Sequence, residues 1–306
     1  MAYNQKLELT RTLGFEIECF VEDVDTHEDS WGDTYVDYDE LNIRHCEIGE
    51  DGSLYGGDGY SIEAKTNPIN NLNKLEETWS DLEKYQFNIN NTCGLHVHVD
   101  TSDFNGNDKA RLLRFAIGIE NLMFALVDES RSERHGEENE YCIKLHRDWR
   151  KIYRRSYVNQ NIHANTYRDL DDFIRNIRNE RNANNGGNRI WNGRYQWINA
   201  QVGHAPTSEF RIFSSTTSYI QAQKFGMLAY HIIETVKHST VNQLEFIIKS
   251  IYQQHTVEAM FDCLFDSIGL DNEFRPSILN YNKVEYLENK FCAVNRQAVQ
   301  SESEAV

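Results

Sequence analysis

The chain has 306 residues, 40% of them hydrophobic and 12% aromatic, which is enough for a substantial core in one large domain or two. Its formal net charge of −17 disfavours nucleic acid as a partner, because neutralising phosphates requires lysine and arginine. The sequence has no apolar run of about 18 residues and no apolar signal-peptide core at its start, so we expect a cytoplasmic protein with no membrane partner. Its six cysteines lack any CxxC spacing, so we expect reduced thiols.

The first half of the chain predicts short strands interrupted by two amphipathic helices. Residues 1–12 are expected to form a frayed or edge segment, and residues 22–40 a polar surface excursion. Alternation of apolar and polar residues predicts the strands, and apolar residues at helical spacing predict the helices. The strands are expected at 13–20, 41–48, 60–66 and 93–100, and the helices at about 70–85 and 108–127.

The second half predicts mostly helices, with two further strands. Helices are expected near 139–151 and around 167–180, strands at 194–201 and 207–213, and a wholly helical region over 219–292. The glycine- and asparagine-rich run 182–188 predicts either a plain linker or a mobile flap beside a site. The sequence therefore predicts one α+β domain over residues 1–295, mostly helical from about 219, followed by a disordered acidic tail at 296–306.

One predicted strand, with the sequence CGLHVHVD at residues 93–100, carries the strongest functional signal. Side chains two apart in a strand point to the same face. One face is therefore apolar, and the other presents His96, His98 and Asp100. A paired imidazole motif of this kind is often structural, so its meaning depends on the neighbouring strands.

Three other predicted strands repeat this division into an apolar face and a charged face. An antiparallel sheet can pack its apolar face on helices and leave the charged face open. The open face would then gather Glu16 and Glu18, Glu63 and Lys65, Glu209 and Arg211, together with the two histidines. Each stretch alone is typical of a solvated or salt-bridged strand, so the functional hypothesis depends on all four sharing one face.

A face so rich in carboxylates requires positive charge. Carboxylate oxygens suit Mg²⁺ or Mn²⁺, and imidazole tolerates Mn²⁺, whereas a zinc site would want more nitrogen or sulfur ligands. We therefore expect divalent cations that bridge nucleotide phosphates. The planar guanidinium of Arg211 suits a phosphate or carboxylate oxygen.

Several motifs in order along residues 12–235 resemble those of the amidoligase family. These are GFEIE at 14–18, EDGS at 50–53, Glu63 with Thr66 and Pro68, CGLHVHVD at 93–100, Ser130-Arg131 with Tyr141-Cys142, RYQWIN at 194–199 and TSEFRIF at 207–213. The family's catalytic core is similar to those of glutamine synthetase and glutamate–cysteine ligase. Its members occur often in phages and mobile elements, so the resemblance implies a phage-type protein.

The resemblance implies a curved antiparallel sheet backed by long helices. It also implies an enzyme that joins a carboxylate to an amine with hydrolysis of ATP to ADP and phosphate. In such chemistry the carboxylate attacks the γ-phosphate, and the amine then displaces phosphate from the acyl phosphate. Small-molecule or peptide substrates are implied, and a homo-oligomer is compatible with the resemblance.

Position by position, the resemblance implies two divalent metals, Mg²⁺ or Mn²⁺. Glu18 and Glu63 would bind one metal. The second metal would be bound by Glu16, His98 and Glu209. His96 would be a ligand or the partner of a ligand. Arg211 would contact phosphate, Asp51 and Ser53 would act at the metal or the amine, and Arg131, Arg194 and, more weakly, Tyr195 would hold substrate carboxylate or nucleotide.

Two other functions fit the same residues. A metal-dependent amide or phosphoester hydrolase would favour zinc and need no nucleotide. A non-catalytic binding or structural protein on the ligase fold is disfavoured by the intact acidic and histidine positions. The motif strand also departs from the family pattern at Lys65, which lies on the metal-side face where an uncharged residue is expected.

Overall fold

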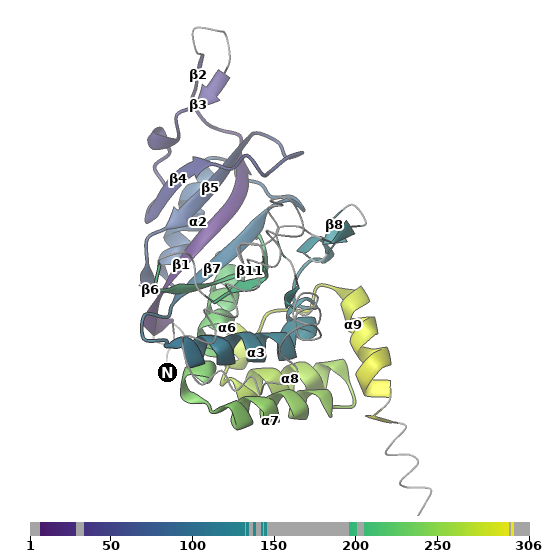
Figure 1. Ribbon diagram of the computed structural model, residues 1–306. Helices are drawn as coiled ribbons and strands as arrows, with labels where there is room; N and C mark the ends of the chain where they lie inside the picture. Colours follow the sequence, from purple (N-terminus) through teal and green to yellow (C-terminus); the bar gives the residue numbers. More distant parts are fainter. Residues whose placement is uncertain are drawn as a thin grey trace, which may run out of the picture.

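The computed structural model describes residues 7–28, 34–131, 133–134, 137–138, 142, 144–145, 196–200, 205–293 and 295–296. Within these ranges the fold combines one open antiparallel sheet with α-helices (Figure 1), which confirms the predicted α+β class. Several predictions fall wholly or mostly outside the described residues. They are the helices near 139–151 and 167–180, the run 182–188, Arg194 and Tyr195, and the tail at 296–306.

The main sheet has the strand order β10-β11-β7-β1-β5-β4, and the short strand β6 also pairs with β1. All of these pairings are antiparallel. The strands are β1 (Glu8–Val21), β4 (Cys46–Glu50), β5 (Tyr60–Thr66), β6 (Ile69–Asn71), β7 (Gly94–Asp100), β10 (Ile198–Asn199) and β11 (Thr207–Ser214). The sheet thus places β11 beside β7, although more than a hundred residues separate them in the sequence.

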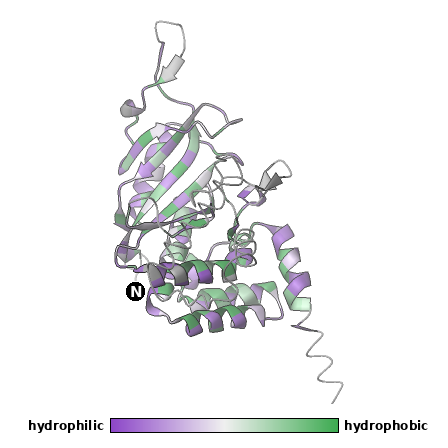
Figure 2. Cartoon of the chain, viewed as in Figure 1, coloured by the Kyte–Doolittle hydropathy of each residue, from purple (hydrophilic) through white to green (hydrophobic). Residues whose placement is uncertain are grey.

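The alternating sequence pattern gives each central strand two unlike faces. Figure 2 shows hydrophilic and hydrophobic residues alternating along these strands. Phe15, Ile17 and Val97 are fully buried on the apolar face, where α2 (Lys74–Lys84) and α6 (Tyr219–His238) pack. The indole N–H of Trp79 on α2 donates to the carbonyl of Thr216, just before α6. The predicted helical backing of the sheet is therefore confirmed for the described residues.

The remaining helices form a second group, in which α3 packs on α6 and the others pack around α3 and one another (Figure 1). They are α3 (Gly106–Met123), α7 (Val241–Tyr252), α8 (Val257–Ser267) and α9 (Tyr281–Leu287), with 3-10 turns at 38–40, 129–131 and 272–274 and a π-helical turn at 288–292. Gly118 lets α3 approach α7 closely, because a Cβ there would meet the side chain of Ile248 at 2.3 Å. No helix among the described residues is long and apolar enough to cross a bilayer.

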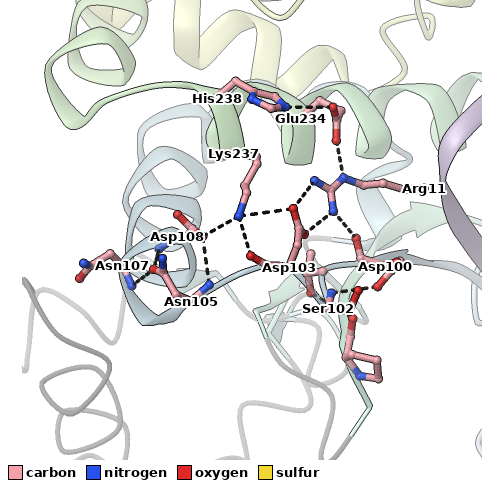
Figure 3. Close-up of polar contacts among 12 residues, drawn as sticks. Arg11, Asp100, Ser102, Asp103, Asn105, Asn107, Asp108, Glu234, Lys237 and His238 are labelled. Carbon is pink, nitrogen blue, oxygen red and sulfur yellow. Dashed lines mark hydrogen bonds and ion pairs between the residues drawn. The ribbon is translucent and has the colours of Figure 1, made fainter.

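A polar network joins the end of the sheet to α6 and α3 (Figure 3). Arg11 on β1 donates to both carboxylate oxygens of Asp103, at 2.5 and 3.0 Å, and to Glu234 on α6. Lys237 bonds Asp108 at 3.0 Å, and Asp108 closes a capping box with Asn105 at the start of α3. These contacts link β1, α6 and the start of α3.

Two sequence predictions near the N-terminus are wrong. Strand β1 begins at Glu8, not at residue 13, because Leu7 and Leu9 are buried and the segment pairs with β6. Residues 41–45 are not a strand, although Leu41 and Ile43 are buried. There the backbone N–H of Arg44 bonds the side chain of Asp81 instead of a neighbouring strand.

Other boundaries also differ from the predictions. The region 22–40 contains a small strand pair, in which the exposed β2 (Thr26–Glu28) pairs with β3 (Thr34–Val36). A second small pair is formed by β8 (Glu133–Arg134) and β9 (Glu137–Glu138). Helix α3 ends at Met123, four residues early, and the segment 219–292 is interrupted at 239–240, 253–256 and 268–280. Each interruption ends at a Thr or Asn cap that starts the next helix, such as Thr256 before α8.

Candidate metal centre

The charged face of the sheet gathers the predicted acids and imidazoles through strand register. Glu16 on β1 lies opposite His96 on β7 and opposite Lys65 on β5. The same register sets Glu18 against Glu63, and Glu209 against His98. Directly opposed residues in an antiparallel pair have close Cβ atoms. Residues from four strands therefore converge as the alternation pattern predicted.

The first group consists of Glu16, His96 and Glu209. Each offers one ligand atom, and these atoms all lie within 4.8 Å of one another. Nδ1 of His96 is 2.9 Å from Glu16 and 3.8 Å from Glu209. His98 adjoins this group, since its Nε2 is 3.3 Å from Glu16 and 3.9 Å from Glu209.

The second group consists of Glu18, Glu63 and, again, His96, with ligand atoms within 4.8 Å of one another. Nε2 of His96 is 3.3 Å from Glu18. The sequence left open whether His96 is a ligand or a partner. The structure places its 2% exposed ring between the two acidic groups, with one ring nitrogen toward each.

Burial sets the protonation of these side chains. Burial raises the pKa of Glu18 to about 7, against the opposing effect of Arg131. Burial also lowers the pKa of His96 to about 3, assisted by Arg211, so the imidazole is neutral at physiological pH. Burial alone would raise the pKa of Glu16, but its interactions with His96 and His98 outweigh burial, and this carboxyl stays ionised. The neutral imidazole of His96 beside the ionised carboxylate of Glu16 is a combination that binds metals.

The buried ring of His98 supports the same interpretation. Its enclosed Nε2 lies 3.3 Å from Oε1 of Glu16 but is not well aligned for a hydrogen bond with any residue that the structure describes. A buried polar atom whose partners are all poorly aligned is costly. A cation shared with Glu16 and Glu209 would satisfy this nitrogen, so the donor set fits a divalent ion.

Arg211 contributes positive charge at one edge of the site. Its guanidinium donates to Glu209 at 2.5 Å and is almost fully buried. Between Phe210 and Phe213 the register of β11 against β7 shifts, so Arg211 and Ile212 both stand opposite His96. Such a β-bulge redirects a side chain, and bulges are common beside active sites. The sequence pattern predicted uninterrupted alternation here and missed the bulge.

Arg131 lies close to Gly94 and acts electrostatically on Glu18, and it is 2% exposed. It donates to the carbonyl of Arg211 at 2.6 Å and to that of Ile212 at 3.4 Å. Gly94 makes room for it, because a Cβ at residue 94 would stand 2.8 Å from its guanidinium. The N–H of Gly94 donates to Glu18 at 2.5 Å. The sequence did not predict this arrangement, in which Arg131 supports β11 and stabilises negative charge on Glu18.

The other candidates lie at the margin or beyond it. Asp51 accepts hydrogen bonds from the N–H and hydroxyl of Ser53 at 2.8 and 2.6 Å. Its charge raises the pKa values of Glu18 and Glu63, after the larger effect of burial. Asp100 accepts from the N–H of Ser102 at the end of β7 and is not part of either group. Arg194 is outside the described residues, so its role stays a prediction.

Comparison with known proteins agrees with this arrangement. A family model described as "putative amidoligase enzyme" matches residues 20–225, more than half of the chain. The match includes the strands that carry Glu63, His96, His98 and Glu209. A comparison with curated proteins gave no match. The extent of the family match shows that this chain belongs to the amidoligase family.

Proposed function

We propose that this protein is an ATP-dependent carboxylate–amine ligase with a glutamine synthetase-like catalytic core and two divalent metals, Mg²⁺ or Mn²⁺. The observation that carries the proposal is the pair of acidic groups that share His96. Glu18 and Glu63 would hold one metal and Glu16, His98 and Glu209 the other, with His96 between them. Bound there, the metals would supply positive charge against the phosphates of ATP.

The protein's own part in the reaction is positioning and charge stabilisation. A substrate carboxylate attacks the γ-phosphate of ATP, giving an acyl phosphate and ADP. The amine then attacks the acyl carbon, phosphate leaves and an amide remains. Arg211, held by Glu209 at 2.5 Å, would bind oxygens of the transferred phosphoryl group bidentately. The buried Arg131 would keep Glu18 and the β11 backbone in place.

The oxygen-rich donor set favours a ligase over a zinc hydrolase, since zinc sites usually take more nitrogen or sulfur. The proposal is tested by measuring ADP release with libraries of carboxylates and amines in Mg²⁺ and in Mn²⁺. We expect ADP release that requires both substrates. Hydrolysis of an amide or phosphoester without nucleotide would contradict the proposal.

Variants test the site itself. Glu18→Gln and Glu209→Gln should abolish Mg²⁺-dependent ATP binding while the far-UV circular dichroism is unchanged. The matched control is Glu245→Gln on α7, whose side chain pairs with Arg114 outside the site. ATP affinity that stays equal in both site variants and the control would defeat the proposed site.

A further inference from the structure

Lys65 lies on the charged face at the edge opposite Arg211. Its Nζ is 2.6 Å from Oε2 of Glu63, and its side chain is 52% exposed, whereas that of Glu63 is 19% exposed. Across the sheet Lys65 lies opposite Glu16 on one side and Glu47 on the other. The ammonium is therefore at the rim, with its partner reaching into the second acidic group.

Glu63 takes part in two interactions that compete. Its carboxylate pairs with Lys65, and the same side chain belongs to the group with Glu18 and His96. A divalent cation on Glu63 would repel the ammonium and occupy its partner. The half-exposed lysine can give way, because its stem is flexible and ion pairs that reach solvent contribute little to stability.

Once displaced, the ammonium remains beside the site and suits an anionic oxygen. Arg211 stands on β11, and β7 and β1 lie between that strand and Lys65 on β5. Three strand spacings separate the two cations by roughly 14 Å of sheet. If phosphate binds at Arg211, a second anion from the other substrate would meet Lys65.

We propose that Lys65 holds Glu63 only until a divalent cation binds there, and then binds a carboxylate of the acid substrate. The metal-dependent displacement is a property of the chain alone, whereas the substrate assignment rests on the proposed ligase function. Lys65 would thus select substrates by charge.

The displacement is tested by titrating the full-length protein with Mn²⁺ alone and following free Mn²⁺ by electron paramagnetic resonance. Lys65→Met should bind Mn²⁺ about threefold to tenfold more tightly than the unmodified protein, because the competing ammonium is gone. Lys65→Arg should restore the weaker affinity. Lys84→Met, which breaks the pair between the exposed Lys84 and the buried Asp81 on α2, outside both acidic groups, is the control and should leave Mn²⁺ affinity unchanged. Equal or weaker Mn²⁺ binding by Lys65→Met would overturn the displacement.

The substrate assignment is tested in saturating Mg²⁺, with the carboxylate that the ADP-release assay identifies. Lys65→Met should raise the KM for that carboxylate about tenfold or more while kcat and the affinity for ATP stay unchanged. A fall in ATP affinity instead would place a phosphate at Lys65 and overturn the assignment. An inactive protein would overturn the ligase function and this assignment together, whereas the Mn²⁺ titration would still decide the displacement.

Discussion

Glu16 and His96 face each other across the pairing of β1 with β7, and an oxygen of Glu16 lies 2.9 Å from Nδ1 of His96. The opposite ring nitrogen of His96 lies 3.3 Å from Glu18. One imidazole therefore touches both acidic groups. This relationship makes the two groups a single unit, not two independent sites.

Replacing the two histidines should have unlike effects on metal binding. His96→Asn should weaken binding of both Mn²⁺ ions by about tenfold or more, because this ring contacts both groups. His98→Asn should weaken one ion only, since among the described acids Nε2 of His98 lies near Glu16 and Glu209. Mn²⁺ stoichiometry and affinity, measured by electron paramagnetic resonance, would distinguish them. Loss of the same single ion in both variants would contradict the shared position of His96.

Gly94 and Arg131 should be energetically coupled. Gly94→Ala would place a Cβ 2.8 Å from the guanidinium and force Arg131 away from the carbonyl of Arg211. We expect a loss of about 1–3 kcal/mol in the free energy of unfolding in urea. In an Arg131→Ala background, the loss in free energy of unfolding caused by Gly94→Ala should be smaller by at least about 1 kcal/mol. Gly49→Ala on β4, where a Cβ would meet nothing within 4 Å, is the control. Additive effects would show that the two residues do not interact.

The Arg11 network should make stability depend on pH in the acid range. Hydrogen bonding to Arg11 lowers the pKa of Asp103 to about 2, whereas an unfolded aspartate titrates near about 3.9. The interaction therefore stabilises the fold above about pH 4 and is lost as the pH falls toward 2. Arg11→Met should lower the free energy of unfolding at pH 7 by about 1–3 kcal/mol.

The difference in free energy of unfolding between the unmodified protein and Arg11→Met should shrink on acidification. Urea unfolding from pH 7 to pH 2.5 measures it. Arg114→Met, which removes the exposed pair with Glu245, should change stability by less than about 1 kcal/mol at any pH. A difference for Arg11→Met that is constant across the range would show that Asp103 titrates normally in the folded protein.

Local alternation was sufficient to predict the strands that carry the site. Strand β5 was predicted at its observed bounds and β7 to within one residue, because period-two patterns are strong in both. The shared face of Glu16, Glu63, His98 and Glu209 followed from the same rule. What alternation cannot predict is a change of register, so the bulge at Arg211 and Ile212 was missed.

Contacts between distant segments were also beyond the sequence pattern. The position of His96 between two groups depends on the register of β7 against β1 and β11 together. Arg131 comes from a short 3-10 turn, and its burial against Gly94 requires that turn to fold back on the sheet. The early start of β1 depends likewise on its pairing with β6.

The strand order has a consequence for synthesis of the protein. β1, β5 and β7 leave the ribosome first, but β11, their neighbour in the sheet, follows only after residue 206. A nascent chain that stops short of Glu209 has the central histidines and most of the acids, yet an incomplete set of candidate ligands and an unpaired edge on β7. The candidate metal centre is therefore completed only when β11, the last central strand to be made, docks on β7.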